Sequence, residues 1–113
     1  MDTKVQSAQA QRIRELNDQL RTTFFQRHGR VLITPGIDAL PVEVKRRVVE
    51  KVKAFEDFES GNDLYRQHDF GSFEIDRQTI FWKIDLYEEP NVKDANGEPV
   101  VTRVLTIKLA NEY

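Results

Sequence analysis

The fold is decided by residues 62–87, NDLYRQHDFGSFEIDRQTIFWKIDLY, which hold six of the chain's eleven aromatic residues. Within this stretch, four apolar residues alternate with four aromatic or charged residues. Successive side chains of a strand point to opposite faces of a sheet, so the wholly apolar face is predicted to lie on the core. The apolar row is Ile80, Trp82, Ile84 and Leu86, and the opposite row is Phe81, Lys83, Asp85 and Tyr87.

One further strand is expected before this one and one after it. Phe73 and Ile75 alternate with acidic residues and predict a preceding strand, joined to it by a tight connection at residues 76–79. Residues 100–110 predict a last strand, whose inward row is interrupted by Arg103. We expect Arg103 to mark a bulge, a strand end or a stem that lies over the edge of the core. The expected inward residues of this strand are Val101, Leu105, Ile107 and Leu109.

Two helices are predicted in the first half of the chain. From about residue 4 to residue 27, apolar side chains recur every three or four positions, which is typical of one buried helical stripe. Gly29 is expected to end this helix in a left-handed conformation. A second helix is expected to begin at Pro41 and to end near Phe58, with valines on its buried face.

The remaining segments complete the predicted order of elements. Residues 31–34 are a short β-branched and aliphatic run, closed by a turn at 35–36, and residues 88–99 are a polar loop. The order is helix, strand, helix and three strands. It predicts an α+β fold in which two helices pack on one face of a mainly antiparallel sheet.

Length and composition limit the possible classes of protein. At 113 residues the chain is expected to form a single domain over residues 1–113, of which 1–10 are frayed. The absence of cysteine excludes disulfides and thiolate chemistry. The N-terminus lacks the apolar stretch of a signal peptide, and no apolar run approaches the roughly 18 residues of a membrane span. We therefore expect a cytoplasmic protein that does not associate with membranes.

A candidate loop site precedes the strands and consists of Asn62, Asp63, Tyr65, His68 and Asp69. A histidine beside carboxylates can supply general acid–base chemistry or ligands for a divalent metal. The spacing matches neither an HExxH helix nor an EF-hand loop, so we assign no catalytic residue, metal ligand or cofactor. The favoured alternative is that His68 is a turn residue or a local hydrogen-bond partner.

A basic cluster on the second predicted helix is a candidate for nucleic-acid contact. Acidic residues along the same helix dilute its field, and the formal net charge of the chain is −2. A solvated amphipathic face is therefore favoured over a phosphate-binding surface. The basic residues are Lys45, Arg46, Arg47, Lys51 and Lys53.

The second face of the predicted sheet is a candidate protein-binding surface, formed by Phe81, Lys83, Asp85, Tyr87 and Lys108. Aromatic side chains between charges on an uncovered sheet suit a protein interface. The alternative is that cross-strand pairs and the N-terminal helix cover this face. A homodimer is also open, because the short strand at 31–34 or the last strand can leave an edge that pairs with a second copy.

Four segments together resemble a family of small bacterial proteins, the DUF3768 family. They are GRVLITPGIDALP (29–41), NDLYRQHDFGSFEID (62–76), FWKIDLYE (81–88) and TRVLTIKLANEY (102–113). The resemblance extends over nearly the whole chain after Ala10. It implies a bacterial cytosolic protein of a kind often carried on plasmids and other mobile elements, and it implies no assigned activity.

The resemblance also implies which positions are worth testing. The chain departs from the family pattern at Leu64, where a proline is expected, and at Gln67, where an acidic residue is expected. These departures weaken the case for a carboxylate metal site in the loop. The positions are Asn62, Asp63, Tyr65, His68, Asp69, Trp82, Lys83, Asp85 and Tyr113.

These observations favour a small, non-enzymatic protein-binding module. A mobile-element regulator, or an inhibitor of a host defence complex such as a CRISPR effector, is one form that such a module takes. Two alternatives stay open. One is a metal-assisted hydrolase or nuclease that uses Asp63, His68 and Asp69, and the other is a nucleic-acid binder that uses the basic helix faces.

Overall fold

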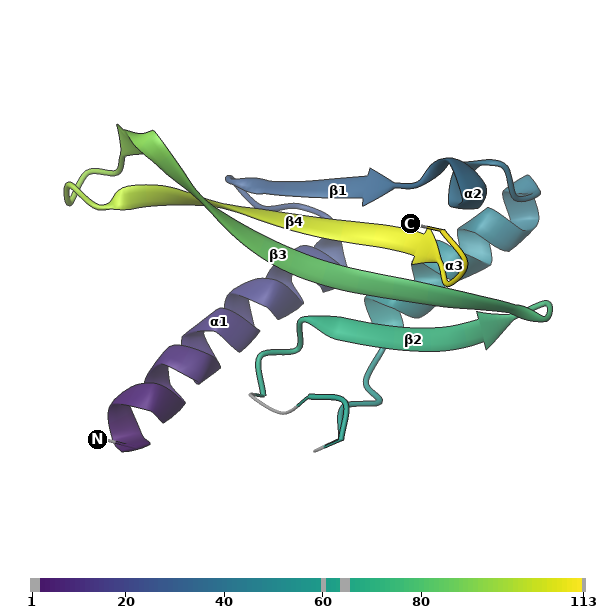
Figure 1. The fold of residues 1–113 in the computed structure, drawn as a ribbon, viewed down its shortest axis with the longest axis horizontal. Helices are drawn as coiled ribbons and strands as arrows, with labels where there is room; N and C mark the ends of the chain where they lie inside the picture. The colour runs from purple at the N-terminus through teal and green to yellow at the C-terminus, as the bar shows by residue number, and fades with distance from the viewer. Residues whose placement is uncertain (1–2, 60, 64–65, 113) are drawn as a thin grey trace.

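The computed structural model describes residues 3–59, 61–63 and 66–112. Three helices and four strands form an α+β fold (Figure 1). No helix in this part of the chain is long and apolar enough to cross a membrane. In chain order the elements are α1 (Thr3–Thr23), β1 (Gly29–Ile33), α2 (Pro35–Asp38), α3 (Val42–Ala54), β2 (Phe70–Ile75), β3 (Gln78–Lys93) and β4 (Pro99–Leu109).

The four strands form one mixed sheet in the order β1-β4-β3-β2. The pairs β2–β3 and β3–β4 are antiparallel, but β1 runs parallel to β4, with Val31 opposite Leu105. The expectation of a mainly antiparallel sheet is therefore wrong. Two helices and two strands separate β1 from β4, so the chain can enter both strands from the same end. The apolar alternation that identifies a strand does not specify the direction of its partner.

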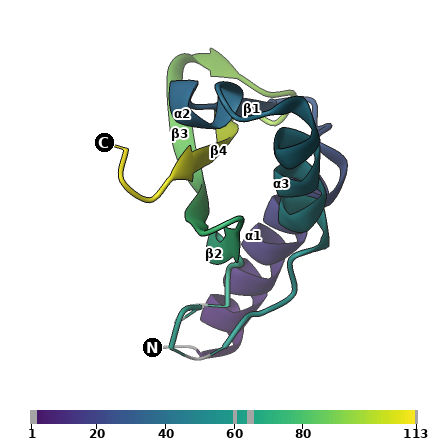
Figure 2. The same ribbon diagram turned by 90° about the vertical axis from the view of Figure 1, so that its right-hand side faces the viewer.

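Both long helices lie on the same side of the sheet (Figure 2). Leu20 of α1 and Val48 and Val52 of α3 are fully buried together with Trp82 and Leu105 of the sheet. Burial of large side chains supplies most of the stability of such a domain, because each removes apolar surface from water. The rest of the buried apolar cluster is Ile37, Phe55, Ile75, Ile80, Ile84 and Ile107.

The first helix ends earlier than the sequence pattern predicts. Helix α1 stops at Thr23, and Phe24 takes the left-handed conformation, with φ 60°. Gly29 is not the cap: it begins β1, and Gly97 is the glycine with positive φ among the described residues. Gly29 is required there for space, because a Cβ atom would lie 2.8 Å from Leu20 Cδ1.

The second predicted helix is also shorter than expected. Helix α3 ends at Ala54, and the following residues leave the helix so that Phe55 and Phe58 pack edge-on against Trp82, with ring centroids 5.5 and 6.1 Å apart. The turn predicted at Pro35 is a four-residue helix, α2, with the proline in its first turn.

The tight connection predicted at residues 76–79, which joins β2 to β3, is confirmed. Asp76 and Arg77 both have positive φ, 47° and 67°, and Ile75 pairs with Gln78. Two left-handed residues in a two-residue turn match the right-handed twist of the flanking strands.

The polar loop predicted at 88–99 is largely wrong. Strand β3 continues to Lys93, with an irregularity in register after Glu89, and only a short turn joins it to β4. In that turn the Asp94 carboxylate accepts hydrogen bonds from the amides of Asn96 and Glu98. Residues 90–98 at this end of the hairpin are exposed, so polar side chains are tolerated on both faces there, whereas Val100 at the start of β4 is buried. Leu86, expected inside, is likewise 42% exposed.

We predict that Trp82→Ala lowers the free energy of unfolding by about 3–5 kcal/mol, because it leaves a cavity where α1, α3 and the sheet meet. The measurement is denaturant unfolding followed by circular dichroism. The control is Phe25→Ala, whose side chain is 81% exposed and whose loss is expected to be nearly neutral. Equal unfolding midpoints for the two variants would contradict the burial of Trp82.

Candidate functional site

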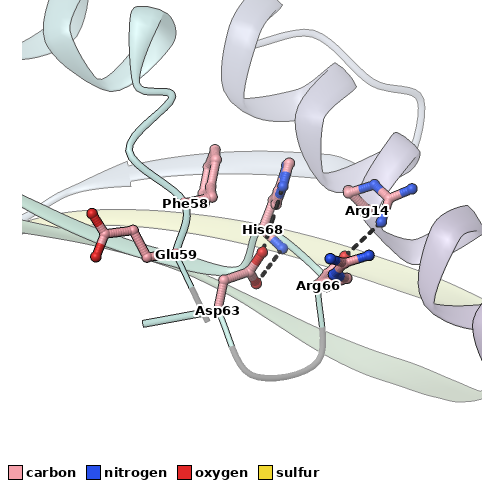
Figure 3. A pocket seen from close by; sticks show the side chains of 6 residues that line it. All are labelled: Arg14, Phe58, Glu59, Asp63, Arg66 and His68. Atoms are coloured by element: carbon pink, nitrogen blue, oxygen red, sulfur yellow. Dashed lines mark hydrogen bonds and ion pairs between the residues drawn. The ribbon is translucent and has the colours of Figure 1, made fainter. Parts of the chain in front are cut away.

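His68 is held on three sides. It lies in the described part of residues 55–69, here called the His68 loop, which joins α3 to β2. Its Nδ1 atom lies 2.9 and 3.0 Å from the two carboxylate oxygens of Asp18, and its Nε2 atom lies 3.5 Å from Asp63 Oδ2. Its ring stacks on Phe58, with centroids 3.7 Å apart (Figure 3). Both ring nitrogens are therefore directed at carboxylates of the protein itself.

Asp63 closes the His68 loop. Its side chain is buried, and Oδ1 accepts a 3.0 Å hydrogen bond from the amide of His68. Its own amide donates to Glu59 O, and its carbonyl accepts from the amide of Arg66. A carboxylate that satisfies a main-chain donor five residues later stabilises a turn.

Helix α1 fixes the loop from the other side. Arg14 donates to the carbonyl of Arg66, and Asn17 Nδ2 donates to the carbonyl of Gln67 at 2.9 Å. The Oδ1 atom of Asn17 accepts a 2.6 Å hydrogen bond from Arg103 Nε. One fully buried amide therefore joins the loop, the helix and the centre of the sheet.

Arg103 lies on the inward face of β4 in regular register, opposite Leu86. It is only 6% exposed, and neither a bulge nor a strand end occurs at its position. Of the three interpretations given for Arg103 from the sequence, the third fits the structure: the stem of its side chain lies over the edge of the core. Burial lowers the pKa of Arg103, and the positive charge of Arg12 acts in the same direction.

Arg21 links the loop to the end of α3. Its guanidinium donates to the carbonyls of Val52 and Lys53 in the last turn of α3, and to Asp18. The Val52 carbonyl also accepts from the amide of Phe55. It also lies over the rings of Phe58 and Trp82, at 5.3 and 5.2 Å from their centroids.

The sequence interpretation missed Asn17, Asp18 and Arg21. A signal for two of them exists: Asn17 and Arg21 lie three or four residues from Ile13, Leu20 or Phe24, and so within the apolar stripe of α1. A polar side chain in such a stripe must find a partner inside the protein.

The other predicted loop residues lie apart from this network. The side chain of Asn62 is exposed and bonds locally to the amide of Glu59 and the carbonyl of Asp57. Burial raises the pKa of Asp69, and the charges of Asp63 and Asp85 act in the same direction. Tyr65, like Leu64 and Tyr113, lies outside the described residues.

A pocket of about 340 Å³ opens beside His68 (Figure 3). Within the described residues, no group of three or more His, Cys, Asp or Glu side chains is arranged to hold a metal ion. Nδ1 lies within hydrogen-bond distance of the Asp18 carboxylate, and Nε2 faces the Asp63 carboxylate. These contacts hold His68 against α1 and against its own loop. The pocket is lined by Arg14, Phe58, Glu59, Asp63, Arg66 and His68.

The basic residues of α3 are largely paired with carboxylates. Lys45 contacts Asp38, and Arg47 contacts Asp76 at 2.7 Å. Arg46 contacts both Glu43 and Glu50. This pattern supports a solvated helix face rather than a site for phosphates.

The outer face of the sheet, opposite the helices, is the second candidate site. Lys83 and Asp85 of β3 form a 3.0 Å ion pair there, and Tyr87 is 54% exposed. Lys108 of β4 lies beside Phe81, which packs on Phe70 at 5.5 Å. The structure thus brings the five predicted interface residues onto one face. Helix α1 lies on the other face and does not cover them (Figure 2).

A shallow depression of about 350 Å³, here called the outer hollow, lies on this face. Leu32 of β1 and Val104 of β4 supply apolar lining, and Leu32 is 51% exposed. At one end, Glu112 accepts hydrogen bonds from Thr34 Oγ1 and from the amides of Gly36 and Leu109. These bonds lower the pKa of Glu112. The charged and aromatic lining is Lys83, Asp85, Tyr87 and Lys108.

The family described as protein of unknown function (DUF3768) matches residues 33–112. The chain belongs to the DUF3768 family. The matched span contains the His68 loop and most of the sheet, but it begins after α1, so Asn17, Asp18 and Arg21 lie outside it. Comparisons with the curated proteins and with the solved structures gave no match. The family resemblance seen in the sequence is thereby confirmed.

We predict that His68→Ala in this DUF3768 protein lowers the free energy of unfolding by about 1–3 kcal/mol, because it removes the stack on Phe58 and the bond to Asp18. Hydrogen exchange is expected to accelerate at residues 66–69. His28→Ala is the matched control, since His28 is exposed. Unchanged exchange in His68→Ala would show that the histidine does not hold the loop.

We also predict that Asp69→Asn gains stability relative to the parent as the pH rises. The folded-state pKa of Asp69 is raised, so the folded protein binds this proton more tightly than the unfolded chain, and ionisation destabilises the fold. The gain should be absent at acid pH and should develop as the pH rises through the raised pKa. A pH series of urea unfolding midpoints measures it, and a constant difference between the two proteins would refute this cause.

Proposed function

We propose that this DUF3768 protein acts by binding another protein through the outer face of its sheet. The observation that carries the proposal is a whole sheet face left uncovered by the helices, which exposes Leu32 and Tyr87 beside charged residues. Antiparallel sheets can leave one face in water, but that face is then usually polar. An aromatic ring and an aliphatic side chain around a hollow suit an interface core within a polar rim.

The charges around the outer hollow indicate the chemistry of the partner. Lys83 forms an ion pair with Asp85. Lys108 forms no ion pair of this kind with a described residue, although its charge acts on Glu112 at the end of the hollow. A partner that places an apolar side chain in the hollow, against Leu32 and Val104, can therefore direct a carboxylate at Lys108. Such complementarity increases the association rate and fixes the orientation of the partner.

A small domain that acts by occupying a partner's surface suits a regulator encoded by a mobile element in a bacterial cytoplasm. An inhibitor of a host defence complex, such as a CRISPR effector, is one such role. The His68 loop gives less support to a hydrolase, because Asp18 and Asp63 face both nitrogens of the only histidine in the pocket. The paired charges of α3 likewise give less support to nucleic-acid binding.

The test is affinity capture of the tagged protein from a bacterial lysate, with and without nuclease treatment, followed by mass spectrometry. We expect a stoichiometric protein partner that survives nuclease. The double variant Lys83→Glu/Lys108→Glu should weaken its binding by about tenfold or more. Lys93→Glu, on the exposed hairpin end, is the matched control for charge reversal and should bind normally. Equal binding by all three proteins would overturn the assignment of this face.

A further inference from the structure

Strand β1 forms one border of the sheet (Figure 1). It pairs with β4 and with no other described strand. A border strand presents a row of unpaired backbone groups, which is a template for another strand. Whether these backbone groups are free therefore affects how copies of the chain can associate.

The hydrogen bonds at both ends of β1 show which residues face the border. His28 O accepts from Arg103 N, and Thr34 N donates to Ile107 O. Backbone groups of a strand alternate in direction, so the even-numbered residues bond to β4, and Val31 and Ile33 point away from it. No described residue forms a hydrogen bond with the amide or carbonyl of either one.

The border of β1 has little of the protection that is usual at a sheet edge. The five-residue strand GRVLI is short and carries one exposed charge, Arg30, but it contains no lysine or proline, and its register with β4 is regular. Leu32 and Ile33 are 51% and 39% exposed. The opposite border, β2, carries an exposed Glu74 near its end.

We propose that β1 pairs antiparallel with β1 of a second copy, about a two-fold axis at Leu32. In this register Val31 of each copy lies opposite Ile33 of the other. The four amides and four carbonyls of these residues, which point away from β4, then bond to one another. Leu32 faces its own counterpart on the outer side, at the short separation of a non-hydrogen-bonded pair. Arg30 faces Thr34, and no like charges are opposed. The strand is therefore complementary to itself, as a two-fold interface requires.

The product is one eight-stranded sheet with its two outer hollows on the same continuous face. Pairing does not depend on the proposed partner binding, although a dimer would present that surface twice. A bivalent surface binds a repeated target more tightly than either half alone.

The test uses Leu32→Lys and Leu32→Glu in the full chain, with mass measured by analytical ultracentrifugation over a concentration series. We expect the parent to dimerise and each variant to weaken dimerisation by about tenfold or more, because like charges then meet across the axis. An equimolar mixture of the two variants should restore the dimer. Val92→Lys and Val92→Glu, at a 50% exposed site on β3, are matched controls and should dimerise like the parent.

A second pair of variants tests the hydrogen bonds themselves. Ile33→Pro removes an amide that points to the border, and β4 does not use that amide, so the variant should fold and remain monomeric. Ile33→Ala retains the amide and should dimerise. The proposal is overturned if the parent is monomeric at every concentration, if the mixed Leu32 variants fail to associate, or if Ile33→Pro dimerises normally.

Discussion

The buried guanidinium of Arg21 is the interaction on which the arrangement of the helices and the His68 loop depends. It is 3% exposed and bonds at once to the end of α3 and to Asp18, while lying over Phe58 and Trp82. A buried cation that loses its partners costs several kcal/mol, so separation of any of these elements from α1 is expensive. Asp18, which accepts a hydrogen bond from Arg21, also contacts His68. This contact fixes the loop to the helix, although the two residues are some fifty positions apart in the sequence.

The strands could be predicted from the sequence because their alternation is a local property. The rows of Trp82 and Lys83 on opposite faces, and the two-residue turn after Ile75, follow from residue order alone. The parallel direction of β1 could not be predicted, because it depends on how the chain returns through α2 and α3. The ends of the helices were also missed. Helix α1 ends where Phe24 takes a left-handed conformation, and α3 ends where Phe55 and Phe58 turn to pack on Trp82, so helix propensity alone does not decide either end.

The same division holds for the two candidate sites. The outer-face residues were identified because a period of two assigns each side chain of β3 to a face. In the loop, Asp63 and His68 were identified from their types and proximity. Their partners on α1 were missed, because a contact between Asp18 and His68 spans the sequence and depends on the packing of two helices. Whether a histidine stabilises a loop or takes part in catalysis depends on such contacts, and the sequence around the histidine does not show them.

The place of β1 in the sheet has a consequence for folding during synthesis. Its partner β4 lies about 70 residues further along the chain, so β1 leaves the ribosome long before any strand is available to pair with it. Contacts between residues so distant in sequence slow the search for the native state. Until β4 has been made, helix α1 and the apolar strand β1 belong to a partly folded chain. Such a chain exposes an unpaired strand edge, which makes it prone to aggregation and a substrate for chaperones.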